Sequence, residues 1–283
     1  MMNAERIEIK TKDKTVSIKN RWELLNRQEF IYLVTLIALY AIKNISKSDL
    51  KLFYVCNAMG LDPVKVKDED GLNNLIIISE QIDFIFDKDD KLNICFLAQL
   101  LPQLKIGRKK YTGYIVNTDY STLTCSLTAA QFVDAWELIK SKSDKLPLLA
   151  SILYSSMPYS SAKAHEQAKV FEKVDPIMLQ AISFNFQGLV NFLFTKTHFS
   201  LLSSGKTNDI PEISTGMQET MYNLSVDGMG DVNSVKQMPV IEFLTILRKK
   251  LIESVQAMHK SGIDMLKIIN ATGLDSQTIK KML

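Results

Sequence analysis

The spacing of apolar residues changes near residue 20, from alternation to helical periodicity. Residues 6–18 alternate apolar and polar side chains across a Lys-Asp-Lys turn, which predicts a small hairpin with one exposed face. From about Asn26 onward, apolar side chains recur every three or four residues, the spacing that gathers them on one side of a helix. The pattern therefore predicts a mainly α, multi-helix globular fold with a small N-terminal β-hairpin and a C-terminal helical extension.

Capping patterns mark several helix starts. Ser46 with Asp49, and Thr128 with Gln131, have the form of capping boxes, and Asp175-Pro176 pairs an N-cap acid with a proline at the first helical position. Residues 107–125 are the least helical stretch and predict either an irregular loop or a second small β element. Helices are predicted over 27–44, 46–57, 72–86, 128–141, 147–154, 161–173, 175–194, 217–226, 239–260, 263–270 and 276–283.

Two of these helices differ in their apolar surface. The helix of 175–194 is apolar on more than one side, so we expect it at the centre of the core. The helix of 239–260 is amphipathic, and the buried stripe that we expect consists of Val240, Leu244, Leu247, Leu251 and Val255. Arg248, Lys249 and Lys250 lie off that stripe, which predicts that they face solvent.

The domain organisation is predicted from one polar segment. Residues 203–215 gather Ser, Gly, Asn, Asp and Pro, a composition typical of a linker. The predicted order is then a hairpin arm over 1–20, a helical core domain over 21–202, the linker, and a C-terminal helical region over 216–283. If function is divided along the chain, we expect the division at this linker.

Composition and charge narrow the class of protein. Apolar residues make up 46% and charged residues 23%, which excludes disorder over the whole length. The net charge of +3 produces no overall field that would attract nucleic acid or an anionic membrane. The strongest apolar run, 30–42, is shorter than the roughly 20 residues of a spanning helix, and the polar start does not resemble a signal peptide. We therefore expect a cytoplasmic protein with no membrane partner.

Residues with reactive side chains are isolated from one another in the sequence. The three cysteines (Cys56, Cys95, Cys125) and three histidines (His165, His198, His259) form no metal-binding pair. Phosphate-loop, dinucleotide-binding, zinc-protease and nucleophile-elbow motifs are missing, and the acidic residues 68–70 do not match a calcium loop and predict a solvated loop. His198 follows the apolar helix but lacks an acid or nucleophile partner. We predict no catalytic residue, no cofactor and no metal, and hence a protein that is not an enzyme.

The C-terminus resembles a helix-turn-helix. Gly273 would occupy the turn between 263–270 and 276–283, with Leu274, Ile279 and Met282 at the buried positions. Two interpretations stay open. A helical hairpin that docks on protein is favoured, because Ile269 stands where a small residue is usual. The alternative is DNA binding, in which the contacting residues would be Ser276, Gln277, Lys280 and Lys281.

Short motifs taken in order carry a family resemblance. They are Trp22-x-x-Leu25-x-x-Gln28, Gln99-Leu-Leu-Pro102, Leu127-Thr-x-x-Gln131-Phe132 with Trp136, Leu148-Leu-Ala-Ser-Ile-Leu-Tyr154, and Tyr222-Asn-Leu-x-x-x-Gly228-x-Gly230-Asp231 followed by Met238-Pro. Over roughly 20–255 the chain resembles a group of proteins encoded among the tail genes of Bacteroidota phages and prophages. The resemblance implies a tail-assembly chaperone or minor virion component in the host cytoplasm or on the virion, whose partners are other protein subunits.

A chaperone for an apolar tail component needs an exposed apolar groove or helix face. Two places in the chain are candidates, the helix of 239–260 and the phenylalanines of 184–199. The residues that we expect to bind a partner are Phe192, Phe194, Phe199, Leu247 and Leu251. The alternative for the phenylalanines is ordinary core packing.

Overall fold

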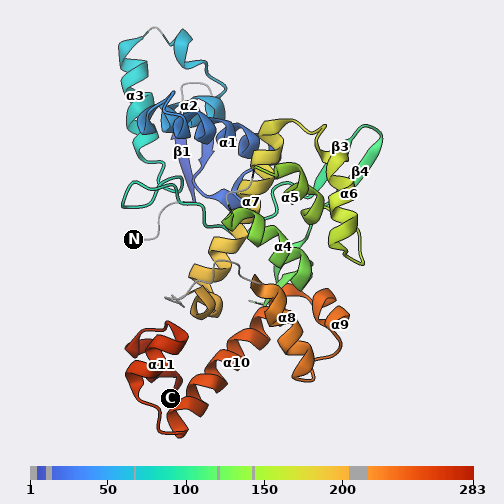
Figure 1. Ribbon diagram of the computed structural model, residues 1–283. Coiled ribbons are helices and arrows are strands. Elements are labelled where there is room, and N and C mark those ends of the chain that lie inside the picture. Colours follow the sequence, from blue (N-terminus) through green and yellow to red (C-terminus); the bar gives the residue numbers. More distant parts are fainter. Residues whose placement is uncertain (1–4, 11–14, 67, 120–121, 142–143, 204–215) are drawn as a thin grey trace. The chain divides into compact units, whose positions relative to one another are not determined.

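The structure is a computed structural model that describes residues 5–10, 15–66, 68–119, 122–141, 144–203 and 216–283. It confirms the predicted mainly α fold with a small N-terminal hairpin (Figure 1). The chain divides into two compact units, each built from two separate segments. Unit 1 is Met1–Leu101 with Val174–Gly188, and unit 2 is Pro102–Lys173 with Leu189–Leu283.

Unit 1 begins with the predicted hairpin, in which Ile7 pairs with Ile18 and Ile9 with Val16. Its elements are β1 (Arg6–Lys10), β2 (Thr15–Lys19), η1 (Trp22–Leu24), α1 (Arg27–Ala41), α2 (Lys47–Met59), η2 (Pro63–Lys65), α3 (Glu69–Glu80) and the first part of α7 (Pro176–Lys196). The capping box at Ser46 and Asp49 is confirmed, and α2 ends at Gly60, whose φ of 71° suits a residue without Cβ. Local side-chain chemistry thus sets both ends of α2.

The predicted helix of 72–86 is wrong at both ends. Helix α3 starts at Glu69, because Asp68 caps it by accepting a hydrogen bond from the Gly71 amide, 3.0 Å from nitrogen to oxygen. The acidic residues 68–70, predicted as a solvated loop, therefore form the helix start, where negative charge interacts favourably with the helix dipole. The apolar residues of 82–86 pack into the core outside any helix, and Phe86 forms an isolated antiparallel bridge with Leu92.

An aromatic core, consisting of Trp22, Phe30, Phe84, Phe96 and Phe184, fills unit 1. Trp22 is central, with ring centroids 5.0 Å from Phe84 and 5.1 Å from Phe96, and its indole N–H donates to the Asn93 carbonyl at 2.9 Å. The segment 96–100 lies against α7. Asn185, itself buried, accepts from the Leu100 amide at 2.8 Å and donates to the Ala98 carbonyl at 2.7 Å. A Cβ at Gly188 would stand 2.4 Å from the Phe96 ring, so this contact requires glycine.

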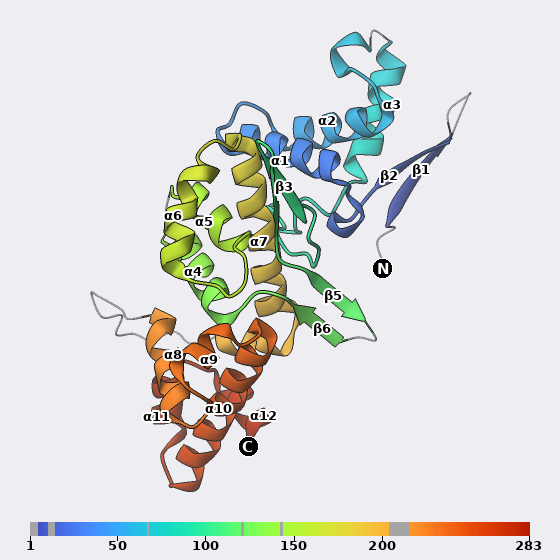
Figure 2. The same ribbon diagram turned by 90° about the vertical axis from the view of Figure 1, so that its right-hand side faces the viewer.

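Unit 2 contains short hairpins and most of the helices (Figure 2). Its elements are β3 (Gln103–Ile106), β4 (Lys109–Thr112), β5 (Val116–Asp119), β6 (Thr122–Cys125), α4 (Ala129–Lys140), α5 (Leu146–Leu153), α6 (Ser161–Phe171), the rest of α7, η3 (His198–Ser203), α8 (Gly216–Val226), α9 (Val232–Gln237), α10 (Val240–Lys260), α11 (Met265–Thr272) and α12 (Ser276–Met282). Strand pairs β3–β4 and β5–β6 confirm the β interpretation of 107–125. Helix α9 was not predicted. Asp231 caps it by accepting from the Ser234 amide at 2.7 Å.

The core of unit 2 gathers around α4 and the end of α7. Phe194 packs on Trp136 with ring centroids 4.4 Å apart. The capping box of α4 is buried, and Gln131 also donates to the Ile152 carbonyl at 3.1 Å, which joins α4 to α5. Among the described residues α7 alone is long and apolar enough to cross a membrane, yet 67% of its apolar window is buried within the protein, as expected for the predicted central helix.

The predicted linker over 203–215 lies outside the described residues, apart from Ser203 at the end of η3. The predicted division into 1–20, 21–202 and 216–283 therefore stays a prediction, and the two compact units follow different bounds.

Candidate functional site: a groove beside α10

Helix α10 has two halves with different surroundings, both within unit 2. At the start of α10 two backbone hydrogen bonds join it to the segment before α4. The Val240 amide donates to the Leu127 carbonyl at 2.9 Å, and the Ala129 amide donates to the Met238 carbonyl at 2.8 Å. Val240, Phe243 and Leu244 are fully buried there. Further along, Leu247 and Leu251 of the predicted stripe are half-buried, and only Val255 is fully enclosed. The second half of α10 therefore keeps part of its apolar side accessible.

Helices α11 and α12 fold back on this second half. Val255, Ile268, Leu274 and Ile279 form a buried C-terminal cluster, surrounded by the partly buried Leu251, Met258, Met265, Ile269 and Met282. Gly273 caps α11 with a φ of 67°, and Gln256 donates to the Met282 carbonyl at 2.7 Å. The predicted turn glycine and the predicted burial of Leu274 and Ile279 are confirmed.

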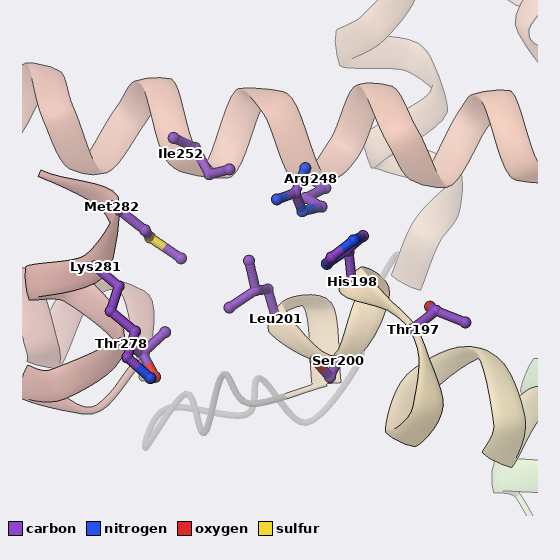
Figure 3. A pocket seen from close by; sticks show the side chains of 9 residues that line it. All are labelled: Thr197, His198, Ser200, Leu201, Arg248, Ile252, Thr278, Lys281 and Met282. Atoms are coloured by element: carbon purple, nitrogen blue, oxygen red, sulfur yellow. The ribbon is translucent and has the colours of Figure 1, made fainter.

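A groove runs between η3, α10 and α12. One cavity of about 420 Å³ lies among all three elements, and Figure 3 shows the residues that line it: Thr197, His198, Ser200, Leu201, Arg248, Ile252, Thr278, Lys281 and Met282. A second cavity of about 770 Å³ shares Thr197, His198 and Arg248 with it and extends toward β6 and the first half of α10. We call these two adjoining cavities the α10 groove.

The groove combines basic, apolar and hydroxyl side chains, the last including Thr197, Ser200 and Thr278. Leu201, Ile252 and Met282 supply apolar surface, whereas Arg248 and Lys281 supply positive charge. No carboxylate lines either cavity within the described part of the chain. The whole excess of three positive charges in the protein lies in 240–283, where seven Lys or Arg face four Asp or Glu. The groove is thus suited to an amphipathic, acidic ligand.

The three consecutive basic residues of α10 have different surroundings, and one prediction about them is wrong. Lys249 faces solvent as expected, with its side chain 76% exposed. Lys250 forms an ion pair with Asp227, 2.5 Å from nitrogen to oxygen. Arg248, predicted to face solvent, projects into the groove, and its Nε is buried without a hydrogen-bond partner. It lies four residues from both Leu244 and Ile252, on the side of α10 that η3 covers.

The predicted partner-binding residues are placed differently from one another. Phe194 is buried against Trp136. This is the ordinary core packing that was the alternative to partner binding for the phenylalanines. Phe192 and Leu247 are half-buried, and Leu251 packs on the C-terminal cluster. Phe199 is largely buried and lines the larger cavity of the α10 groove. The structure thus brings one of these five residues to the groove wall.

The residues of the DNA-binding alternative lie on two sides of α12. Gln277 and Lys280, three residues apart, are both exposed on one side, and Ser276 is half-buried at the helix start. Lys281 lies on the other side, where it lines the α10 groove with Thr278 and Met282. The two lysines therefore do not share one surface of the helix.

Other polar groups of the described residues serve the fold. Tyr159 donates to Asp134 at 2.5 Å, and burial followed by that carboxylate raises the pKa of Tyr159 well above its usual range. Its backbone exchanges two hydrogen bonds with Gln237, at 2.9 and 3.2 Å, so this cluster joins α4 to α9. Burial raises the pKa of the Cys125 thiol to about 11, which leaves it unreactive. Within the described ranges, no three His, Cys, Asp or Glu residues gather as a metal site would require.

Sequence reasoning missed the two residues that characterise the groove, His198 and Arg248. Arg248 lies four residues from both Leu244 and Ile252, which places it on the same side of α10 as these apolar residues. The sequence carried this signal, but we gave more weight to the usual exposure of a Lys-Arg run. For His198 the sequence carries no comparable signal, because η3 reaches α10 only through the tertiary fold. No family model, no curated protein and no solved structure matches this chain, so the function must be argued from the groove itself.

Proposed function

We propose that this protein is a phage-type assembly or structural protein, a tail-assembly chaperone or minor virion component, that acts by holding a segment of a partner protein in the α10 groove. The groove carries the proposal. It combines half-buried apolar side chains on a long helix with a basic wall, and it is large enough for several side chains of a partner. The resemblance of 20–255 to phage tail-cluster proteins supplies the biological context. On this proposal the protein performs no chemistry and acts in the host cytoplasm or on the virion.

Site-specific photo-crosslinking tests the proposal. A photoreactive amino acid replaces Ile252, which lines the groove, in the full chain co-produced with the products of its neighbouring genes. We expect a crosslink to one tail-related subunit. The matched control places the same amino acid at Lys249, which faces solvent on the same helix. Equal crosslinking at the two positions, or crosslinks only to unrelated proteins, would remove the proposal.

A second candidate function is DNA binding by the C-terminal helices. The specific observation in its favour is the three-residue turn with Gly273 in left-handed conformation and Leu274 buried, between two short helices that pack on α10. The exposed Gln277 and Lys280 would then meet the duplex.

A gel-shift assay across salt concentrations decides this second candidate. DNA binding through Lys280 would weaken steeply with salt, and replacing Lys280 by Met would reduce the slope by about one. Replacing Lys249 by Met is the matched control, since it removes the same charge from a neighbouring exposed position. Absence of binding at low salt would exclude DNA as the ligand.

A further inference from the structure

Arg248 is the residue of the α10 groove that, among those described, lacks a hydrogen-bond partner for a buried atom. Its Nε is buried, and it has no hydrogen-bond partner among the described residues. A buried donor without a partner is destabilising, and such donors are rare in native proteins. Arg248 is therefore arranged to meet an acceptor that the described part of the chain does not supply.

The charges around Arg248 indicate what that acceptor is. Several other basic side chains of the described residues pair with a carboxylate, as Lys19 pairs with Glu29 at 2.6 Å. Arg248 and Lys281 instead line one cavity with no carboxylate in its described wall, and His198 adds a ring that can donate a further hydrogen bond. An anion bound beside Arg248 would offset a positive charge that no carboxylate in the described wall neutralises.

The apolar neighbours restrict the kind of anion. Figure 3 shows Leu201, Ile252 and Met282 pointing into the same space as Arg248. A small hydrated ion would leave these side chains without contacts, whereas an acidic side chain flanked by apolar ones on a helix would satisfy both parts of the wall. A planar carboxylate also matches the two-pronged geometry of a guanidinium.

We propose that Arg248, together with His198, recognises an Asp or Glu side chain of an amphipathic partner helix whose apolar residues contact Leu201, Ile252 and Met282. This inference rests on the proposed function and adds to it the chemistry of the partner. The positive excess of 240–283 assists it, because a basic region draws acidic segments during encounter. Arg248 is in this view the residue that sets specificity, and the apolar side chains supply most of the contact area.

The test is a selection of displayed, helix-forming 15-residue random peptides on the immobilised full chain, with affinities then measured by fluorescence anisotropy. We expect enriched peptides to carry one acidic residue at a fixed spacing from two apolar residues. Changing that acid to its amide should weaken binding about tenfold or more, the loss typical of a buried charged hydrogen bond. Arg248→Met should weaken peptide binding by a similar factor. Arg248→Lys should give an intermediate loss, because lysine keeps the positive charge but cannot donate two parallel hydrogen bonds to one carboxylate.

Lys249→Met is the matched control, because it removes the same charge one residue away from a solvent-facing position. We expect it to leave affinity within about twofold, as for an exposed charge. Equal losses for the two Met variants, or enriched peptides without acid that still compete for the groove, would overturn the role of Arg248 but leave the proposed function standing. Displacement of the peptide by millimolar inorganic phosphate would also overturn it, in favour of a phosphate ligand. Leu201→Arg places a large charged side chain in the groove and should abolish peptide binding there. If no peptide binds, or if this substitution leaves all binding intact, both proposals fail.

Discussion

The aromatic core of unit 1 and the C-terminal cluster of unit 2 are two ways of holding helices together. The aromatic core draws rings from residues 22 to 184, and one ring fits against a glycine. The C-terminal cluster draws four aliphatic side chains from residues 255 to 279, and methionines surround it. Large rings in close contact specify one arrangement, whereas methionines adapt to several. By this difference unit 1 is the more rigid region, and the adaptable surface of unit 2 suits the partner binding that we propose.

Phe96→Ala should have the largest effect, because it breaks the aromatic core at its centre. The ring is fully buried and contacts Trp22, Phe30 and Phe184. We expect a loss of about 3–5 kcal/mol in the free energy of unfolding, measured by urea denaturation in a Trp136→Phe background, in which Trp22 is the single fluorescent tryptophan. A loss below about 1 kcal/mol would show that the aromatic core tolerates truncation of a buried side chain as well as the C-terminal cluster does.

Gly188→Ala tests the close fit by adding a methyl group rather than removing a ring. The new Cβ would lie 2.4 to 2.8 Å from atoms of the Phe96 ring, so we expect a loss of about 2–3 kcal/mol in the same denaturation experiment. Adding Phe96→Leu to this variant should restore part of the loss, since the smaller side chain makes room. Full additivity of the two substitutions would contradict a direct clash.

Ile279→Ala should act locally, because the C-terminal cluster is small. Removing this buried side chain should lower the opening free energy of α12 by about 2 kcal/mol, seen as faster hydrogen exchange in 265–282. We expect the urea transition reported by Trp22 to stay unchanged. A matching shift of that transition would mean that the two regions unfold as one and would remove the contrast between them.

Asp275 should make the smallest contribution, and one that depends on pH. Hydrogen bonds from the Thr278 side chain and backbone lower the pKa of this N-cap carboxyl. Its stabilising effect is therefore present above the unfolded value of about 3.9 and is lost as pH falls through the lower folded pKa. We expect the Ile279 methyl NMR signal to report loosening of α12 below about pH 4, and Asp275→Asn to flatten that response, since Asn caps a helix without titrating.

Helix starts could be predicted from the sequence because capping is local. Ser46 with Asp49, Thr128 with Gln131, and Asp175-Pro176 each place polar atoms within one turn of the amides that they satisfy. The end of α3 could not be predicted, because the apolar residues of 82–86 suit a buried non-helical segment as well as a helix. The choice between these was made by tertiary contacts, including the hydrogen bond that Asn20 accepts from the Asp83 amide at 3.2 Å.

The candidate site could be predicted only in part. The apolar stripe indicated α10, the helix that lines the groove, and Phe199 lines the larger cavity while Leu251 packs on the C-terminal cluster. The wall of the smaller cavity includes residues of η3 and α12, which are far apart in the sequence. The spacing of apolar residues within one helix cannot predict that two such distant segments lie close together. Arg248 was misassigned because a charged run usually faces water, and only the position of η3 places that side chain in a cavity.

The discontinuous build of unit 1 has a consequence for the order of synthesis. Its first segment ends at Leu101, but the part of α7 that carries Asn185 and Gly188 is translated only after the intervening 102–173. At usual elongation speeds, the rings of Trp22, Phe84 and Phe96 must wait roughly 4 to 17 seconds on the ribosome for Phe184 and the helix beneath it. During that interval these rings lack the helix that covers them, and co-translational chaperone capture is expected there rather than after release.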